Sequence, residues 1–294
     1  MGGLAEWLLD SDPALRWQVQ RDLLCAPEEV WLATRGLVAV EGFGARLLGL
    51  QGVDGMWGGG AFFPLGYDGE EGQPWTATTW SLNSLREWGL DASVLKARRT
   101  VELLAEGCRW EYDGLPYWGG EVDCCINGWT LANGVWLGAP VEGIAEWFVA
   151  HQLEDGGWNC EWGAGAARSS FHSTLNSLKG LLAHEVATGD DGYAGRAGEG
   201  GGVSAGEAVV SAVVHWGVCG EWVTRFRSPF RWEYSVLNAA DYFWRAGVRD
   251  PRMAEAVELI RRAGRLTGHG CRVGGIRGGC GSRSTLTRGS RRSG

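Results

Sequence analysis

The sequence predicts an all-α protein in which about six helical hairpins stack into a closed ring, with an inner and an outer layer of helices. Apolar residues recur at helical spacing through most of the 294 residues. Glycine (49 residues) and tryptophan (18 residues) are far above ordinary usage and gather in turn motifs between the helices. Similar segments return about every 45–50 residues, which is room for two helices and a turn. Such a hairpin buries its apolar face only by stacking on its neighbours.

The N-terminal quarter predicts short helices joined by tight turns. In residues 4–25, Asp12 is placed to cap a helix whose first turn contains Pro13, and Trp17 and Leu24 follow at helical spacing. Residues 27–50 predict a second pair of helices.

Clear turn motifs then separate the predicted helices. Residues 51–60 read Q-x-x-D-G-x-W-G-G-G, and residues 152–158 repeat the core of this pattern. We interpret these motifs as structural, because Trp seals each turn onto its neighbour and glycine allows the tight backbone. Helices are predicted between and around the turns at 75–90, 93–106, 123–137, 141–153 and 171–186.

Three of these helices are internal repeats. Leu82, Leu131 and Leu175 hold the same place in WSLNSL, GWTLANG and STLNSL, at spacings of 131 − 82 = 49 and 175 − 131 = 44 residues. A fourth copy spans 228–247. The repeats predict one ring-shaped domain over residues 1–263.

Two stretches break the pattern. Residues 189–220 keep little helical periodicity, and we expect an irregular segment there. Residues 264–294 form a basic tail rich in Gly, Arg and Ser that contains no acidic residue. This composition predicts either a disordered tail or the product of a shifted reading frame in a GC-rich gene.

Charge and composition exclude several classes. The net charge of −8 argues against a nucleic-acid partner. No apolar run approaches the roughly 20 residues of a membrane span. The N-terminus lacks the features of a signal peptide, so the eight cysteines favour a reduced, cytoplasmic setting over a disulfide framework.

The motifs resemble two related families. The Q-x-x-D-G-x-W turns at 51–58 and 152–158 look like the repeats of squalene–hopene and related triterpene cyclases. The segments VDCC (122–125) and FHST (171–174) look like the zinc-site segments of protein prenyltransferase β subunits. Both families share the α/α toroid, and the resemblance covers residues 4–188 and, less closely, 221–263. It implies a fold with an inner helix ring around an apolar cavity.

Carried over to this chain, the resemblance implies a zinc ion held by Asp123, Cys125 and His172. Zinc accepts oxygen, sulfur and nitrogen donors in a tetrahedron, and three protein ligands leave one position open for a substrate thiol. Cys124 and Cys160 are interpreted as packing residues, with Cys160 as the reserve ligand. The resemblance also implies an isoprenoid or similar lipid-like ligand, held by aromatic residues near the heads of the inner helices. The candidates for this cavity lining are Trp75, Trp80, Trp118, Trp129, Phe171 and Trp232.

Departures from the two families leave the function open. The D-x-D-D motif with which triterpene cyclases protonate their substrate is missing, and no diphosphate-binding cluster is recognisable. The expected function, based on the implied zinc ligands and the aromatic residues, is an enzyme, a zinc-dependent transferase or cyclase that moves or rearranges a prenyl group. The alternative is a toroid without catalytic activity that holds a lipid or a partner protein. A third possibility, the thiol chemistry of lanthipeptide cyclases, ranks last because their Trp-Cys-Tyr-Gly and Cys-His-Gly signatures are not found.

Overall fold

A computed structural model describes residues 2–69, 72–120, 123–190, 225–226 and 229–266. These residues are mostly helical, and the predicted all-α class is confirmed. Extended pairing among them is limited to isolated bridges, Trp57 with Gly60 and Arg109 with Pro116. The α-helices are α1 (Gly2–Leu9), α2 (Pro13–Gln18), α3 (Glu28–Gly36), α4 (Gly42–Gly49), α5 (Thr78–Glu87), α6 (Ala92–Ala97), α7 (Thr100–Gly107), α8 (Cys124–Leu137), α9 (Glu142–Ala150), α10 (Phe171–Thr188), α13 (Val236–Arg245) and α14 (Met253–Leu266).

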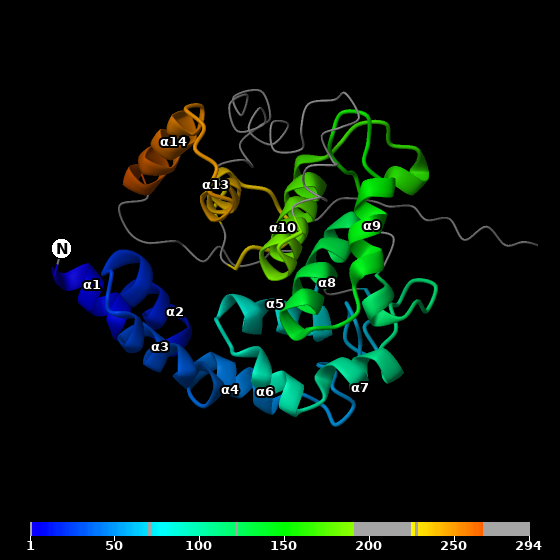
Figure 1. The fold of residues 1–294 in the computed structure, drawn as a ribbon, viewed down its shortest axis with the longest axis horizontal. Helices are drawn as coiled ribbons and strands as arrows, with labels where there is room; N and C mark the ends of the chain where they lie inside the picture. Colours follow the sequence, from blue (N-terminus) through cyan, green and yellow to red (C-terminus); the bar gives the residue numbers. More distant parts are fainter. Residues whose placement is uncertain (1, 70–71, 121–122, 191–224, 227–228, 267–294) are drawn as a thin grey trace, which may run out of the picture.

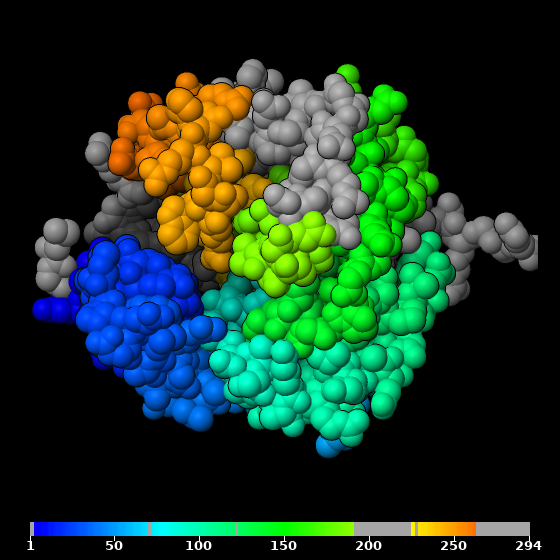
Figure 2. All heavy atoms as spheres, in the orientation of Figure 1, coloured from blue at the N-terminus to red at the C-terminus, as the bar shows by residue number. Residues whose placement is uncertain are grey.

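The helices follow one another around the molecule in chain order. In Figure 1, α3, α4, α6, α7 and α9 run along the periphery, while α8 and α10 lie further inside. On the face shown in Figure 2, the N-terminal helices, the α8–α10 region and the α13–α14 pair succeed one another around the surface. None of the described helices is long and apolar enough to cross a membrane.

Among the described helices, α8 and α10 form the most extensive contact, and glycine makes it close. A Cβ atom on Gly128 of α8 would lie 2.4 Å from the carbonyl oxygen of Asn176 in α10. A Cβ atom on Gly180 of α10 would lie 2.5 Å from the carbonyl oxygen of Gly128. The two backbones therefore touch directly, and most of α8 is buried on every side.

The predicted helix start at Asp12 is confirmed. Its carboxylate accepts a hydrogen bond from the Ala14 amide at 2.9 Å, and Pro13 is the first helical residue. The same carboxylate accepts from the Phe43 amide at 2.7 Å, so the cap also joins the first hairpin to α4.

The two turn motifs have matching hydrogen bonds. The Trp57 indole donates to the Leu47 carbonyl at 2.7 Å, and the Trp158 indole donates to the Phe148 carbonyl at 2.9 Å. Both indoles are 1 % exposed. Each tryptophan thus ties its turn to the preceding helix, as the structural interpretation of the motif requires.

The glutamines of the motifs also have a structural role. The Gln51 side chain donates to the Gly55 carbonyl at 3.1 Å, and the Gln152 side chain donates to the Gly156 carbonyl at 2.7 Å. Each glutamine therefore closes its own turn.

The predicted domain limits fall partly outside the described residues. Of the irregular segment 189–220, only Gly189 and Asp190 are described, and Gly189 caps α10 with a φ of 73°. Residues 264–266, which we assigned to the tail, are the last residues of α14. The remainder of the tail, 267–294, lies outside the described residues.

Candidate metal centre

The start of α8 carries an acidic cap followed by two cysteines. Asp123 Oδ1 accepts hydrogen bonds from the Cys125 amide at 2.7 Å and the Ile126 amide at 3.3 Å. These bonds satisfy two of the amides that a helix leaves unpaired at its N-terminus. They also fix the carboxylate beside Cys124, the first residue of the helix.

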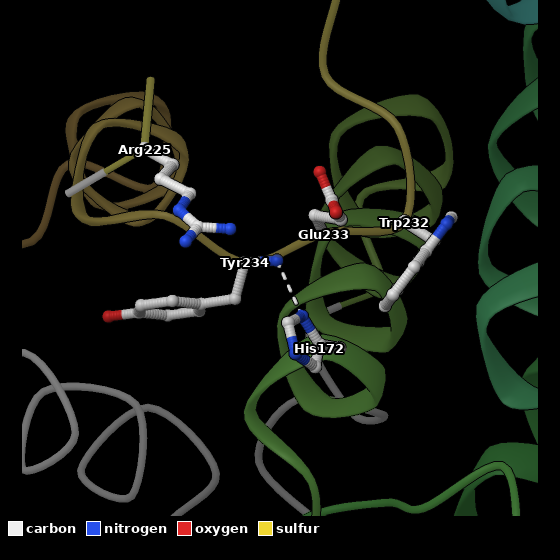
Figure 3. A pocket seen from close by; sticks show the side chains of 5 residues that line it. All are labelled: His172, Arg225, Trp232, Glu233 and Tyr234. Atoms are coloured by element: carbon white, nitrogen blue, oxygen red, sulfur yellow. Dashed lines mark hydrogen bonds between the residues drawn. The ribbon is translucent and has the colours of Figure 1, made fainter. Parts of the chain in front are cut away.

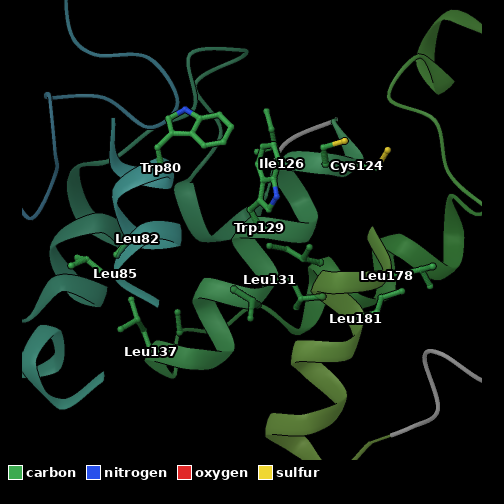
Figure 4. Close-up of a cluster of buried hydrophobic side chains, with 14 of the residues drawn as sticks. Trp80, Leu82, Leu85, Cys124, Ile126, Trp129, Leu131, Leu137, Leu178 and Leu181 are labelled. Atoms are coloured by element: carbon green, nitrogen blue, oxygen red, sulfur yellow. The ribbon is translucent and has the colours of Figure 1, made fainter. Parts of the chain in front are cut away.

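A third cysteine reaches this point from the turn between α9 and α10. The Cys160 amide donates to Ser173 Oγ at 3.2 Å, and this hydroxyl donates to Cys160 Sγ at 3.2 Å. Because Ser173 belongs to α10, which packs on α8, the turn is held over the start of α8. Cys124 lies at the edge of the buried apolar cluster formed by α5, α8 and α10 (Figure 4).

The side chains of these residues converge on Cys160. Cys160 Sγ lies 2.8 Å from Asp123 Oδ1, 3.4 Å from Cys124 Sγ and 3.4 Å from Cys125 Sγ. Within the described part of the chain, the donor atoms of Asp123, Cys124 and Cys160 form a metal-capable group in which all lie within 4.8 Å of one another. We call these three residues the donor triad.

The donor triad fits a zinc ion in chemistry and in approximate size. Thiolate and carboxylate are zinc ligands, and Zn–S bonds of about 2.3 Å in a tetrahedron place two sulfurs about 3.8 Å apart. The 3.4 Å between Cys124 and Cys160 is close to this value. The contact between Cys160 and Asp123 is shorter than a tetrahedral edge, so the triad would open by less than about 1 Å to hold the ion.

The protonation of the cluster reflects burial and mutual hydrogen bonding. Burial, reinforced by the neighbouring Cys160, raises the pKa of Asp123 well above its ordinary value. Hydrogen bonds with Cys125 and Cys160 lower the pKa of Cys124 to about 5. Hydrogen bonding with Cys124 raises the pKa of both other thiols. Because Cys and carboxyl ligands bind a metal in their deprotonated form, metal binding at this cluster would release protons.

Cys125 lies beside the donor triad. It is 6 % exposed, and its sulfur accepts a hydrogen bond from Asn176 Nδ2 of α10 at 3.4 Å. The metal-capable group therefore shares only Asp123 with the predicted ligand set of Asp123, Cys125 and His172. Adjacent residues of a helix point about 100° apart, and it is Cys124 that falls within the triad.

His172 lies in a different setting. Its Nδ1 accepts a hydrogen bond from the Tyr234 amide at 2.6 Å, and its ring packs edge-on against Trp232. It lines a cavity of about 190 Å³ together with Arg225, Trp232, Glu233 and Tyr234 (Figure 3). Burial lowers the pKa of His172, which favours the neutral imidazole. His172 is not part of the metal-capable group found among the described residues.

The predicted cavity-lining aromatic residues divide into two settings. Trp80 and Trp118 are 1 % and 5 % exposed and donate their indole hydrogens to the Phe62 and Val101 carbonyls, so both are packed in the core. Trp129 packs on Trp80 with ring centres 4.8 Å apart. The other three residues are partly exposed. Trp75 packs against Trp80, Phe171 packs against Tyr234, and Trp232 lines the His172 cavity.

Sequence reasoning placed Cys124 and Cys160 among the packing residues and missed Ser173. The available signal was the return of the turn motif: Cys160 follows Trp158 by two residues, in the turn that leads into α10. A turn sealed by Trp158 lies at the head of the inner helices, where the start of α8 also lies.

Comparison with known proteins finds no matching family model, no similar curated protein and no similar solved structure. The functional argument therefore rests on the geometry of this chain.

Proposed function

We propose that this chain is a zinc-dependent transferase of isoprenoid groups, built as an α/α toroid, with the donor triad as its metal site. The observation that carries the proposal is the convergence of a carboxylate and two thiols from separate elements within 4.8 Å. The order of peripheral and interior helices in Figure 1 supports the toroid. Cys124 is buried and the other two residues are half-buried, and thiols and a carboxylate are ligands that zinc accepts.

The residues of the chain divide the work at this site. Asp123, Cys124 and Cys160 would hold the ion, and a bound zinc ion supplies a Lewis acid that keeps an incoming thiol as a thiolate. Ser173 positions Cys160 through two hydrogen bonds. Trp232, which is partly exposed and lines the His172 cavity, offers an aromatic surface for a hydrocarbon chain.

A second candidate function is a toroid without catalytic activity in which the metal is structural. The Cys125 sulfur, 3.4 Å from Cys160, is placed to become a fourth ligand and close the coordination sphere. The cavity at His172, of about 190 Å³, is smaller than the roughly 300 Å³ of ordinary ligand pockets. The position of Cys125 favours a closed metal site, and the small volume of the His172 cavity argues against a prenyl chain bound there.

The test of the metal site is the zinc content of protein purified under reducing conditions. We expect one zinc per chain in the parent and in Cys25→Ser, whose cysteine is exposed, and in Cys108→Ser, which controls for the loss of a buried thiol. Cys160→Ser and Cys124→Ser should lose most of the metal. Full zinc occupancy in both of these variants would refute the donor triad.

Cobalt substitution separates the two candidate functions. The intensity of thiolate-to-cobalt absorption reports how many sulfurs bind the ion. If Cys125→Ser leaves this band unchanged, the site has an open position and the transferase is favoured. If the band falls by about a third, the site is closed and structural. Transfer from farnesyl diphosphate to a small thiol, abolished in Cys160→Ser, would establish the activity.

A further inference from the structure

Three sulfur atoms meet where the α9–α10 turn lies over the start of α8. Cys160 Sγ lies 3.4 Å from Cys124 Sγ and 3.4 Å from Cys125 Sγ, so one sulfur of the turn is in contact with two neighbouring cysteines of the helix. All three residues are free thiols in this structure. An S–S bond of about 2.05 Å would form if either pair of sulfurs approached by about 1.4 Å.

The three thiols differ in their access to solvent. Cys160 is half-buried, whereas Cys124 is fully buried and Cys125 is 6 % exposed, so a small oxidant reaches Cys160 first. The Ser173 hydroxyl donates a hydrogen bond to Cys160 Sγ at 3.2 Å. A donor at the sulfur stabilises the thiolate, which is the form that attacks a peroxide. Cys160 is therefore placed to react first, and the two cysteines of α8 are placed to react with its product.

We propose that Cys160 is a peroxide-sensitive thiol whose sulfenic acid is captured as a disulfide by one of the two cysteines at the start of α8. In the first step, the Cys160 sulfur attacks one oxygen of hydrogen peroxide, the O–O bond breaks, and a sulfenic acid and one water result. In the second step, the sulfur of Cys124 or Cys125 attacks the Cys160 sulfur. The S–O bond breaks, the S–S bond forms, and a second water leaves. Overall, two thiols lose two electrons and two protons, and one peroxide becomes two waters.

The equal distances give Cys160 two alternative partners. Whichever disulfide forms first, the third thiol lies beside the Cys160 sulfur and can attack it, so the disulfide exchanges between the two partners. Either disulfide uses Cys160, a member of the donor triad. Oxidation would therefore remove a metal ligand, and this consequence rests on the proposed metal site, whereas the thiol chemistry does not.

Peptide mass spectrometry tests the proposal directly. Protein freed of metal with EDTA is treated with hydrogen peroxide, blocked with iodoacetamide and cleaved after glutamate. This cleavage places Cys160 in residues 155–161 and the other two cysteines in residues 122–142. We expect a disulfide between these two peptides that dithiothreitol removes, and a several-fold lower yield when the chain is unfolded in urea. No linked pair in the folded protein, or equal yields with and without urea, would overturn the proposal.

Variants test the two-partner arrangement. Cys124→Ser and Cys125→Ser should each keep the linked pair, because the remaining partner lies at the same distance of 3.4 Å. The double variant should lose the pair and accumulate sulfinic acid on Cys160. Cys108→Ser, which removes a buried thiol elsewhere, should behave as the parent does. Loss of the linked pair in either single variant would refute the arrangement.

Zinc added before the peroxide separates this proposal from the metal site. If the donor triad binds zinc, the ion should slow formation of the linked pair several-fold, and the oxidised protein should take up no zinc until it is reduced. If the linked pair forms at the same rate with and without zinc, the metal site is wrong and the peroxide-sensitive thiol stands.

Discussion

The protonation of Lys179 predicts how stability depends on pH. Burial lowers the pKa of this amine from 10.5 to about 8, with Glu87 and Asp241 opposing the shift. Between these values the unfolded chain binds a proton that the folded chain has lost, so the free energy of unfolding rises with pH. The difference of 2.5 pKa units, at 1.36 kcal/mol each, gives a gain of about 3 kcal/mol from pH 7 to pH 11.

The measurement is urea unfolding followed by tryptophan fluorescence, at intervals across this pH range. Cysteines and tyrosines also titrate there, so the useful quantity is the free energy of unfolding of the parent minus that of Lys179→Met. We expect this difference to rise by about 3 kcal/mol as pH increases. The same comparison with Lys96→Met should stay flat, because Lys96 is exposed. A flat or falling curve for Lys179→Met would refute the reasoning.

Two further predictions concern packing and the turn motif, and both are measured by urea unfolding. Gly128→Ala should lower the free energy of unfolding by about 1–3 kcal/mol, since the added methyl would overlap the α10 backbone. Gly143→Ala in α9 should raise it by about 0.5–1 kcal/mol, because nothing lies within 4 Å of the added methyl. Equal effects of the two would contradict the close approach. Trp158→Phe should cost about 1–3 kcal/mol, because the Phe148 carbonyl loses its indole donor. Trp57→Phe should cost less, because the Leu47 carbonyl also accepts from the Leu50 amide at 3.1 Å. A neutral result at either position would show that the indole bond does not hold the turn.

The helices and turns were predictable because their signals are local. Asp12 and Pro13 start a helix through contacts within a few residues, and the structure confirms the Asp12 cap. The turn tryptophans were also recognisable, because each bonds to a helix that ends only a few residues earlier. The ring arrangement depends on contacts between distant hairpins, and it stays a prediction.

The membership of the metal-capable group was not predictable, because it depends on the rotation of each helix. The amides of Trp158 and Cys160 bond to the hydroxyls of Thr174 and Ser173, so these two residues of α10 face the turn. His172 precedes them, and a rotation of about 100° per residue directs it to a different side, where it meets Tyr234.

The repeat register explains why the sequence pattern pointed to His172. If the repeats are aligned on Leu82 and Leu175, equivalent residues lie 93 positions apart, and Thr78 is equivalent to Phe171. The hydrogen bonds give a different register, because the Trp57 amide bonds to Thr78 and the Trp158 amide to Thr174, 96 positions later. A shift of three residues leaves the apolar face of a helix pointing in nearly the same direction. It moves every residue along the helix axis by most of the length of one turn. Relative to its turn, α10 therefore begins almost one turn earlier than α5 does. His172 stands beyond the level of the Cys160 turn, and Cys160, from the turn itself, is the residue that joins Asp123 and Cys124 in the metal-capable group.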